Sequence, residues 1–185
     1  MPYTIMSRIL ILYSTCEGHT ARIAGRVAQV LRDAGHEVES CRVDGASGQP
    51  EITAYTAVIV GASIHYGAHP RMLRNLLRRH RGDMAARPTA FFSVSLSGGG
   101  PGAKPAAAQR YLENFLRQTR WQPALTASFA GALQYSKYGV FKRRLMRMIV
   151  GFAGGDTDMS RDYEYTDWAA VDRFAENFAK HMQQA

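Results

Sequence analysis

The chain of 185 residues has few cysteines, no long apolar run and no surplus of acidic residues. Its two cysteines, Cys16 and Cys41, cannot form a disulfide framework, and they suit a reducing compartment such as the cytosol. No apolar run approaches the roughly 20 residues that a membrane-spanning helix requires. Residues 1–18 show neither a basic n-region nor a small-residue cleavage site, so we expect no export signal.

The bulk composition is that of a globular protein, with 46% hydrophobic and 21% charged residues. The length suits a single domain over residues 1–185. The net charge of +8 is unusual and favours an anionic partner, which is nucleic acid, an anionic membrane surface or an acidic small molecule. We do not expect nucleic acid, because the arginines are scattered over predicted helices without a recognised binding module.

Strand and helix patterns alternate along the chain. Apolar runs predict strands at residues 8–13, 36–44, 57–63, 89–96 and 125–133. Helical spacing of apolar residues predicts helices at 20–34, 70–80, 106–118 and 168–182. This order predicts an α/β fold, a doubly wound five-stranded parallel sheet with helices on both faces. A Gly/Pro-rich loop at 97–105 and a long basic insertion at about 134–158, after the fifth strand begins, do not fit the minimal pattern.

The loop at 14–20, which reads STCEGHT, follows the first strand and opens the first helix. Ligands of open parallel sheets bind at this edge, and a helix N-terminus favours an anion there. Ser14, Thr15 and Thr20 offer hydroxyl donors, and Gly18 allows close approach of the backbone. The loop holds no Lys or Arg, so it predicts a phosphate site made of neutral donors.

Three other interpretations of this loop fit less well. A dinucleotide fingerprint requires G-x-G-x-x-G, of which only Gly18 is present, and the stretch GGGPGAKP does not match a nucleotide triphosphate loop. Cys16 and Arg22 have the C-x5-R spacing of a cysteine-dependent phosphatase. Arg22 lies among the polar positions of its helix, however, and the chain has no Asp-Pro pair, so phosphatase activity stays a distant alternative.

The pattern Ser-Thr-x-x-Gly-x-Thr resembles the phosphate loop of the flavodoxin family, which implies a flavodoxin-like fold and bound FMN. The ends of the third and fourth strands would then hold the flavin ring, with His65 and Tyr66 as stacking candidates. The residues expected to contact the cofactor are Ser14, Thr15, Cys16, Glu17, Gly18, His19, Thr20, Ala62, Ser63, Ile64, His65, Tyr66, Gly67, Ser93, Val94, Ser95 and Leu96.

The segment 140–152 predicts a cationic amphipathic helix, because it contains four basic residues and no acidic one. Phe141, Leu145, Met148, Ile149 and Phe152 share one face of the helical wheel. Such a helix either docks on the core, or lies on an anionic membrane, or borders a site for a large, apolar, acidic substrate.

Later stretches of the chain indicate a narrower family among the flavodoxin-like proteins. These stretches read VIVGASIHYG, AFFSVSL, AGALQYSKY, GGDTD and YTDW. With the phosphate loop, they resemble the menaquinone-dependent protoporphyrinogen IX dehydrogenases, flavodoxin-like enzymes of haem biosynthesis. The resemblance implies that FMN takes electrons from protoporphyrinogen IX and passes them to a membrane quinone, menaquinone or ubiquinone. It also implies a cytoplasmic enzyme peripherally associated with the inner membrane. No metal is expected, and a homo-oligomer is left open.

The residues expected to contact substrate or membrane are Tyr135, Lys137, Tyr138, Phe141, Lys142, Arg143, Arg144 and Arg147. His65 and Tyr66 are the candidates for a catalytic role, and no protein base is assigned. A general FMN-dependent NAD(P)H:quinone reductase and a flavodoxin-like electron carrier remain the alternative functions.

Overall fold

The computed structural model describes residues 6–45, 50–65, 67–137, 139–152 and 154–184. At its centre is a five-stranded parallel sheet in the order β2-β1-β3-β4-β5. The strands are β1 (Arg8–Ser14), β2 (Glu37–Arg42), β3 (Ala57–Ser63), β4 (Thr89–Ser95) and β5 (Leu125–Ala130). The predicted sheet and its doubly wound class are confirmed.

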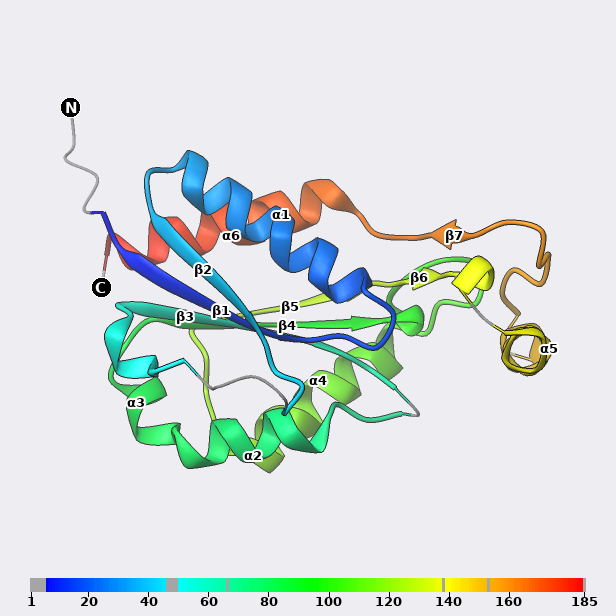
Figure 1. The fold of residues 1–185 in the computed structure, drawn as a ribbon, viewed down its shortest axis with the longest axis horizontal. Coiled ribbons are helices and arrows are strands. Elements are labelled where there is room, and N and C mark those ends of the chain that lie inside the picture. The colour runs from blue at the N-terminus through cyan, green and yellow to red at the C-terminus, as the bar shows by residue number, and fades with distance from the viewer. Residues whose placement is uncertain (1–5, 46–49, 66, 138, 153, 185) are drawn as a thin grey trace.

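Helices cover both faces of the sheet (Figure 1). One layer contains α1 (His19–Asp33) and α6 (Trp168–Met182), and the other contains α2 (Arg71–Arg79), α3 (Arg81–Ala85) and α4 (Pro105–Thr119). The chain reverses its direction of winding between β1 and β3, and this is the point where doubly wound sheets bind ligands. No helix of the described residues is long and apolar enough to cross a membrane.

The strands are continuously apolar because each buries both of its faces. In β1, Ile9 and Ile11 pack into the core beneath α1 and α6. Leu10 and Leu12 alternate with them and pack into the second core, which includes Phe91. All four β1 side chains are fully buried, so the periodicity of the sequence matches a strand at the centre of a covered sheet.

The predicted fifth strand, 125–133, is wrong in its C-terminal part. The backbone leaves the sheet at Gly131, whose N–H donates to the Ser95 carbonyl at 3.0 Å. A separate strand β6 (Ala132–Leu133) pairs antiparallel with β7 (Tyr163–Glu164). The sequence also did not predict α3, nor the 3-10 turns η1 (Ile52–Ala54), η2 (Leu96–Gly98) and η3 (Tyr135–Lys137), because such short elements carry little periodicity.

The helix expected at 140–152 is α5 (Val140–Phe152), which lies beyond the end of the sheet beside β6 and β7 (Figure 1). Val150 is buried in a small satellite core. Met148 and Phe152, by contrast, are 54% and 88% exposed. These two members of the predicted apolar face therefore lie on the surface, and the docked-helix interpretation does not account for them.

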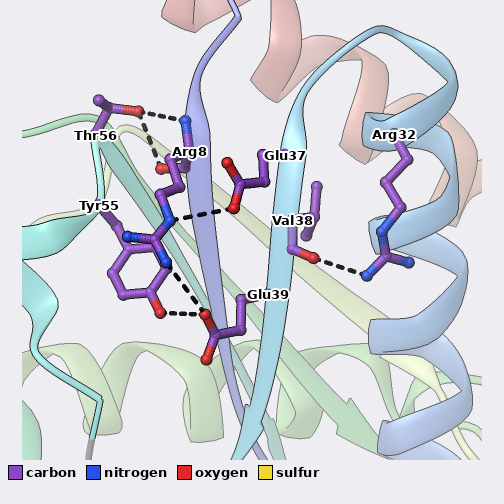
Figure 2. Close-up of polar contacts among 7 residues, drawn as sticks. All are labelled: Arg8, Arg32, Glu37, Val38, Glu39, Tyr55 and Thr56. Carbon is purple, nitrogen blue, oxygen red and sulfur yellow. Dashed lines mark hydrogen bonds and ion pairs between the residues drawn. The ribbon is translucent and has the colours of Figure 1, made fainter.

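At the other end of the sheet, where β1 and β2 begin, side chains form a group of polar contacts (Figure 2). Arg8 forms ion pairs with Glu37 at 3.3 Å and Glu39 at 3.7 Å, and the Tyr55 hydroxyl donates to Glu39 at 2.5 Å. Partial burial and the bond to Glu39 raise the pKa of Tyr55 to about 12. The ion pairs are half exposed and contribute little stability. They join β1 to β2, and the Tyr55 hydroxyl joins β2 to the segment just before β3.

Candidate functional site

A cavity of about 330 Å³ opens at the carboxyl ends of β1, β3 and β4. Its walls are formed by the loop after β1, the ends of β3 and β4, the segment 131–132, and side chains of α4 and α5. Both its size and its mostly apolar lining are typical of a small-molecule site, for which about 300 Å³ is the lower end of the usual range.

The structure brings three separate predicted segments together around this cavity. The predicted cofactor residues that line it are Thr15, Cys16, Glu17, His19, Thr20, Ser63, Ile64, His65, Gly67, Val94, Ser95 and Leu96. Ser14, Gly18, Ala62 and Ser93 lie beside it without lining it, and Tyr66 falls outside the described residues.

Five further residues complete the lining, and they are Ser97, Tyr111, Gly131, Ala132 and Met146. Gly131 directly follows β5. Its position at the carboxyl edge of the predicted sheet was the signal that could have identified it as a lining residue. Tyr111 and Met146 lie within helices α4 and α5, and no local motif marks either one.

The start of α1 has the features on which the predicted phosphate site depends. Gly18 adopts the left-handed conformation with a φ of 89°, and its N–H donates to Thr15 Oγ1 at 2.9 Å. No side chain caps the helix, and its first turn has no acidic residue. Backbone N–H groups at such a helix start bind anionic ligands in many proteins. No Lys or Arg occurs among the described lining residues, so the available donors are neutral.

His19 connects this turn to the segment between β7 and α6. Thr166 Oγ1 donates its only proton to the Ala130 carbonyl at 2.8 Å. It must therefore accept the bond at 2.6 Å from His19 Nε2, which assigns a proton to that nitrogen. The His19 ring also meets the edge of Trp168, with centroids 6.2 Å apart. The β7–α6 segment thus fixes the orientation of a lining residue 147 positions away.

The two serines at the end of β4 have different surroundings. Ser93 is fully buried and bonds to His69 Nε2 at 2.9 Å. Burial, and secondarily the charge of Arg74, lowers the pKa of His69 to about 3, so this imidazole is neutral. The Ser95 hydroxyl is buried at the cavity wall and has no hydrogen-bond partner within the described residues. A bound ligand would supply that partner.

The structure contradicts the phosphatase interpretation. The Arg22 guanidinium bonds to Glu164 at 2.5 Å and lies over the Trp168 ring at 5.4 Å, so it is held by β7 and α6. Cys16 is exposed at the cavity, 4.0 Å from the Ser63 hydroxyl, and Arg22 is not among the residues that line this cavity. A phosphoryl group at the thiol would lack the arginine that this chemistry needs.

The residues predicted for substrate or membrane have mixed locations. Arg144 and Arg147 are exposed and line an open groove with Met148 and Phe152. The prediction for Tyr135 is wrong, because its ring is fully buried and its hydroxyl donates to the Asp156 carbonyl at 2.9 Å. Tyr138 lies outside the described residues, and so do the side chains of Lys137, Phe141, Lys142 and Arg143.

The glycine-rich loop after β4 has a packing role. A Cβ at Gly99 would lie 2.7 Å from Ala130 Cβ, and one at Gly100 would lie 2.8 Å from the Tyr165 ring. Glycines therefore let the loop approach β5 and the β7–α6 segment. Across the described residues, no cluster of His, Cys, Asp or Glu could hold a metal ion.

Known proteins resemble this chain along most of its length. The sequence model of the flavodoxin domain family matches residues 10–160. A protein named protoporphyrinogen IX dehydrogenase (quinone) from Leishmania major is 40% identical over 173 residues, which cover 93% of this chain and 74% of that protein. The Escherichia coli K12 protein of the same name is 33% identical over 172 residues, with 93% and 94% covered.

Among solved structures, oxidised flavodoxin 1 from Bacillus cereus superposes with a TM-score of 0.58. Its sequence is 16% identical, and the match covers 95% of this chain and 99% of the flavodoxin, so it supports the fold alone. From the matched domain and the two relatives, the chain belongs to the flavodoxin domain family and groups there with the protoporphyrinogen IX dehydrogenases (quinone).

Proposed function

We propose that this protein is an FMN-dependent dehydrogenase that oxidises protoporphyrinogen IX to protoporphyrin IX and passes the electrons to a membrane quinone. The proposal rests on one observation above all. The cavity at the switch point of the sheet combines an uncapped helix N-terminus, neutral hydroxyls and apolar walls. Flavodoxin-like sheets of this strand order hold FMN at the same place, and the two relatives carry the name of this activity.

The residues of the cavity fit FMN. The N–H groups of the first turn of α1, with the hydroxyls of Thr15 and Thr20, would hold the phosphate. The segments 63–65 and 94–96 would hold the ring, and the Ser95 hydroxyl would gain the partner that it lacks. When bound, FMN supplies the electron transfer between substrate and quinone.

The protein's own contribution is to bind, orient and exclude water. Ile64, Val94, Tyr111 and Met146 provide an apolar wall from four different elements or loops. His65 lies at the exposed rim, and its backbone pairs with Ala68 through bonds of 3.0 and 3.2 Å. Because an imidazole at the rim of the cavity can accept a proton, His65 is our candidate for this role toward the substrate.

Helix α5 would bind the acidic part of the substrate and the membrane. Met146 lines the main cavity while Arg144 and Arg147 line the adjacent groove, so one helix borders both. The two guanidinium groups suit the propionates of the porphyrinogen. Exposed Met148 and Phe152 suit the lipid in which a quinone dissolves. Their exposure supports the part of the proposal in which the enzyme binds peripherally to the cytoplasmic face of the inner membrane.

The decisive test is anaerobic reduction of the reconstituted flavoprotein. The apoprotein is titrated with FMN, and its absorption spectrum is followed after protoporphyrinogen IX or NADPH is added. We expect bleaching by the porphyrinogen and recovery with a quinone. Reduction by NADPH alone would instead indicate a general quinone reductase, and no turnover of porphyrinogen with quinone present would indicate an electron carrier.

A matched pair of variants tests the site. Ser95→Ala removes a hydroxyl from the cavity wall, whereas Ser93→Ala removes one that bonds to His69. We expect Ser95→Ala to raise the Kd for FMN by about fivefold to tenfold, the effect of one hydrogen bond, and Ser93→Ala to leave it within about twofold. Equal Kd values for both variants and the wild type would place FMN elsewhere.

A further inference from the structure

The net charge of the chain is concentrated in one continuous stretch. Residues 71–120 contain ten basic and two acidic residues, which gives a charge of +8 and equals the charge of the whole chain. The remaining thirteen basic and thirteen acidic residues cancel. This stretch forms α2, α3, β4, η2 and α4. Strand β4 is buried and contains no charged residue. The charge of residues 71–120 is therefore carried by the helices and loops on one side of the sheet.

The tertiary structure collects this charge on one surface. Helices α2, α3 and α4 cover the same face of the sheet (Figure 1). Arg78 of α2 donates to the carbonyl of Gln118 in α4 at 2.8 Å, so the two helices lie in contact. We define the α2–α4 basic face by six arginines, all at least partly exposed, which are Arg71, Arg74, Arg78, Arg110, Arg117 and Arg120.

Among the described residues, no ion pair joins an arginine of this face to a carboxylate. Among the described ion pairs, the only one within residues 71–120 joins His80 to Asp83. Arg117 bonds to the neutral amide of Asn114 at 2.7 Å. On the other layer, by contrast, Arg26 pairs with Asp172 at 2.6 Å. The α2–α4 basic face is therefore a positively charged surface, and α5, with four basic residues and no acidic one, is a second positive segment.

The exposed side chains of this face indicate what kind of partner it binds. The six arginines lie on two helices and at the C-terminal end of one of them, and none of them lines either of the two described cavities on this side of the molecule. The large apolar side chain exposed in this layer is Met72, at 40%. Binding of single-stranded nucleic acid relies on exposed aromatic rings, and the described residues of the layer expose none. A broad field of arginines beside an apolar side chain suits a surface of lipid phosphates.

We propose that the α2–α4 basic face is a contact surface for an anionic lipid bilayer. It is separate from the groove on α5, and it requires neither FMN nor the porphyrinogen. The two surfaces would act together, one through charge and the other through the exposed Met148 and Phe152.

Co-sedimentation with vesicles tests the surface. The full chain is mixed with phosphatidylcholine vesicles, with and without phosphatidylglycerol, at low and high salt. The test variant combines Arg71→Gln, Arg78→Gln, Arg110→Gln and Arg117→Gln. The matched control variant combines four substitutions of ion-paired arginines, Arg8→Gln, Arg26→Gln, Arg42→Gln and Arg173→Gln. Both variants lose the same net charge.

We expect the wild type to bind only the anionic vesicles and to be released by salt. Each arginine at such a surface changes the binding constant by about fivefold, so the test variant should bind at least about a hundredfold more weakly. The control should stay within about threefold. Should the test variant fail to fold, the two double variants, one on each helix, are each expected to lose about 25-fold.

Three results would overturn the proposal. The test variant could bind like the wild type, or the control could lose as much affinity, which would make net charge alone responsible. A single-stranded oligonucleotide could bind the wild type more tightly than the vesicles at the same salt, which would make nucleic acid the partner. A double variant, Arg144→Gln with Arg147→Gln, separates this face from α5: loss of binding in that variant with none in the test variant contradicts the assignment.

Discussion

Replacing Thr166 by Val should destabilise the protein and weaken binding of FMN, although Thr166 lines no part of the cavity. The hydroxyl of Thr166 joins His19 to the Ala130 carbonyl through bonds of 2.6 and 2.8 Å. Val has nearly the same shape and cannot form either bond. The substitution therefore removes the polar connection between the first turn of α1 and the end of β5.

The expected magnitude follows from burial. His19 is 6% exposed and Ala130 is 8% exposed, so neither polar group gains full access to water when its partner is lost. An unsatisfied buried donor or acceptor costs about 1–3 kcal/mol, so the free energy of unfolding should fall by roughly 2–4 kcal/mol. For a chain of this length, each kcal/mol lowers the Tm by about 2–4 °C.

Urea unfolding of the apoprotein measures the first effect, and quenching of FMN fluorescence on binding measures the second. We expect a rise in the Kd for FMN of about tenfold, because His19 is no longer held at the cavity wall. Thr166→Ser is the control, since it keeps the hydroxyl and should retain most of the stability and affinity. The interpretation fails if Val and Ser are equally tolerated, or if Val lowers stability and leaves the Kd unchanged.

Three further predictions concern single positions. His69 has a pKa of about 3 in the folded state, whereas its ordinary value is 6.5. Between these two pH values only the unfolded state takes up a proton at this side chain, so the free energy of unfolding falls as the pH falls below about 6.5. Between about pH 7 and pH 5 the loss should be about 2 kcal/mol larger than in His69→Gln, as measured by urea unfolding at each pH. Gly61→Ala would place a Cβ 2.1 Å from the Phe92 ring and should cost about 1–3 kcal/mol. Its combination with Phe92→Leu should cost less than the two single variants added together, and strict additivity would contradict the clash. Cys16→Ser should leave porphyrinogen oxidation within about threefold of wild type, since no step requires the thiol, and a complete loss of turnover would restore a nucleophilic role.

The α/β order and the position of the loop that opens α1 were predictable because both are local in the sequence. A strand buried on two faces needs an unbroken apolar run, as in residues 57–63, and a surface helix needs an apolar stripe. A helix start with hydroxyls and Gly18, directly after the first strand, marks an anion site by position alone.

Other features depended on neighbours that are distant in the sequence. The break at Gly131 follows from the pairing of β6 with β7, so a single apolar run contributes to two sheets. Tyr135 looked like a surface aromatic beside basic residues, yet its ring fills the core beneath α5. Tyr111 reaches the cavity from the middle of α4, and helical periodicity does not distinguish such a residue from any other half-buried tyrosine.

The sequence by itself determined the class of fold, the position of the Gly18 turn at the start of α1 and the total charge, because these depend on local periodicity, turn chemistry and composition. Only the tertiary structure decided what completes the cavity and where the charge is presented. Parallel crossovers bring loops from distant parts of the chain to one edge of the sheet, and they place α2 and α4 on one face. The partner of each polar side chain is chosen by that packing, and no local pattern of residues encodes it.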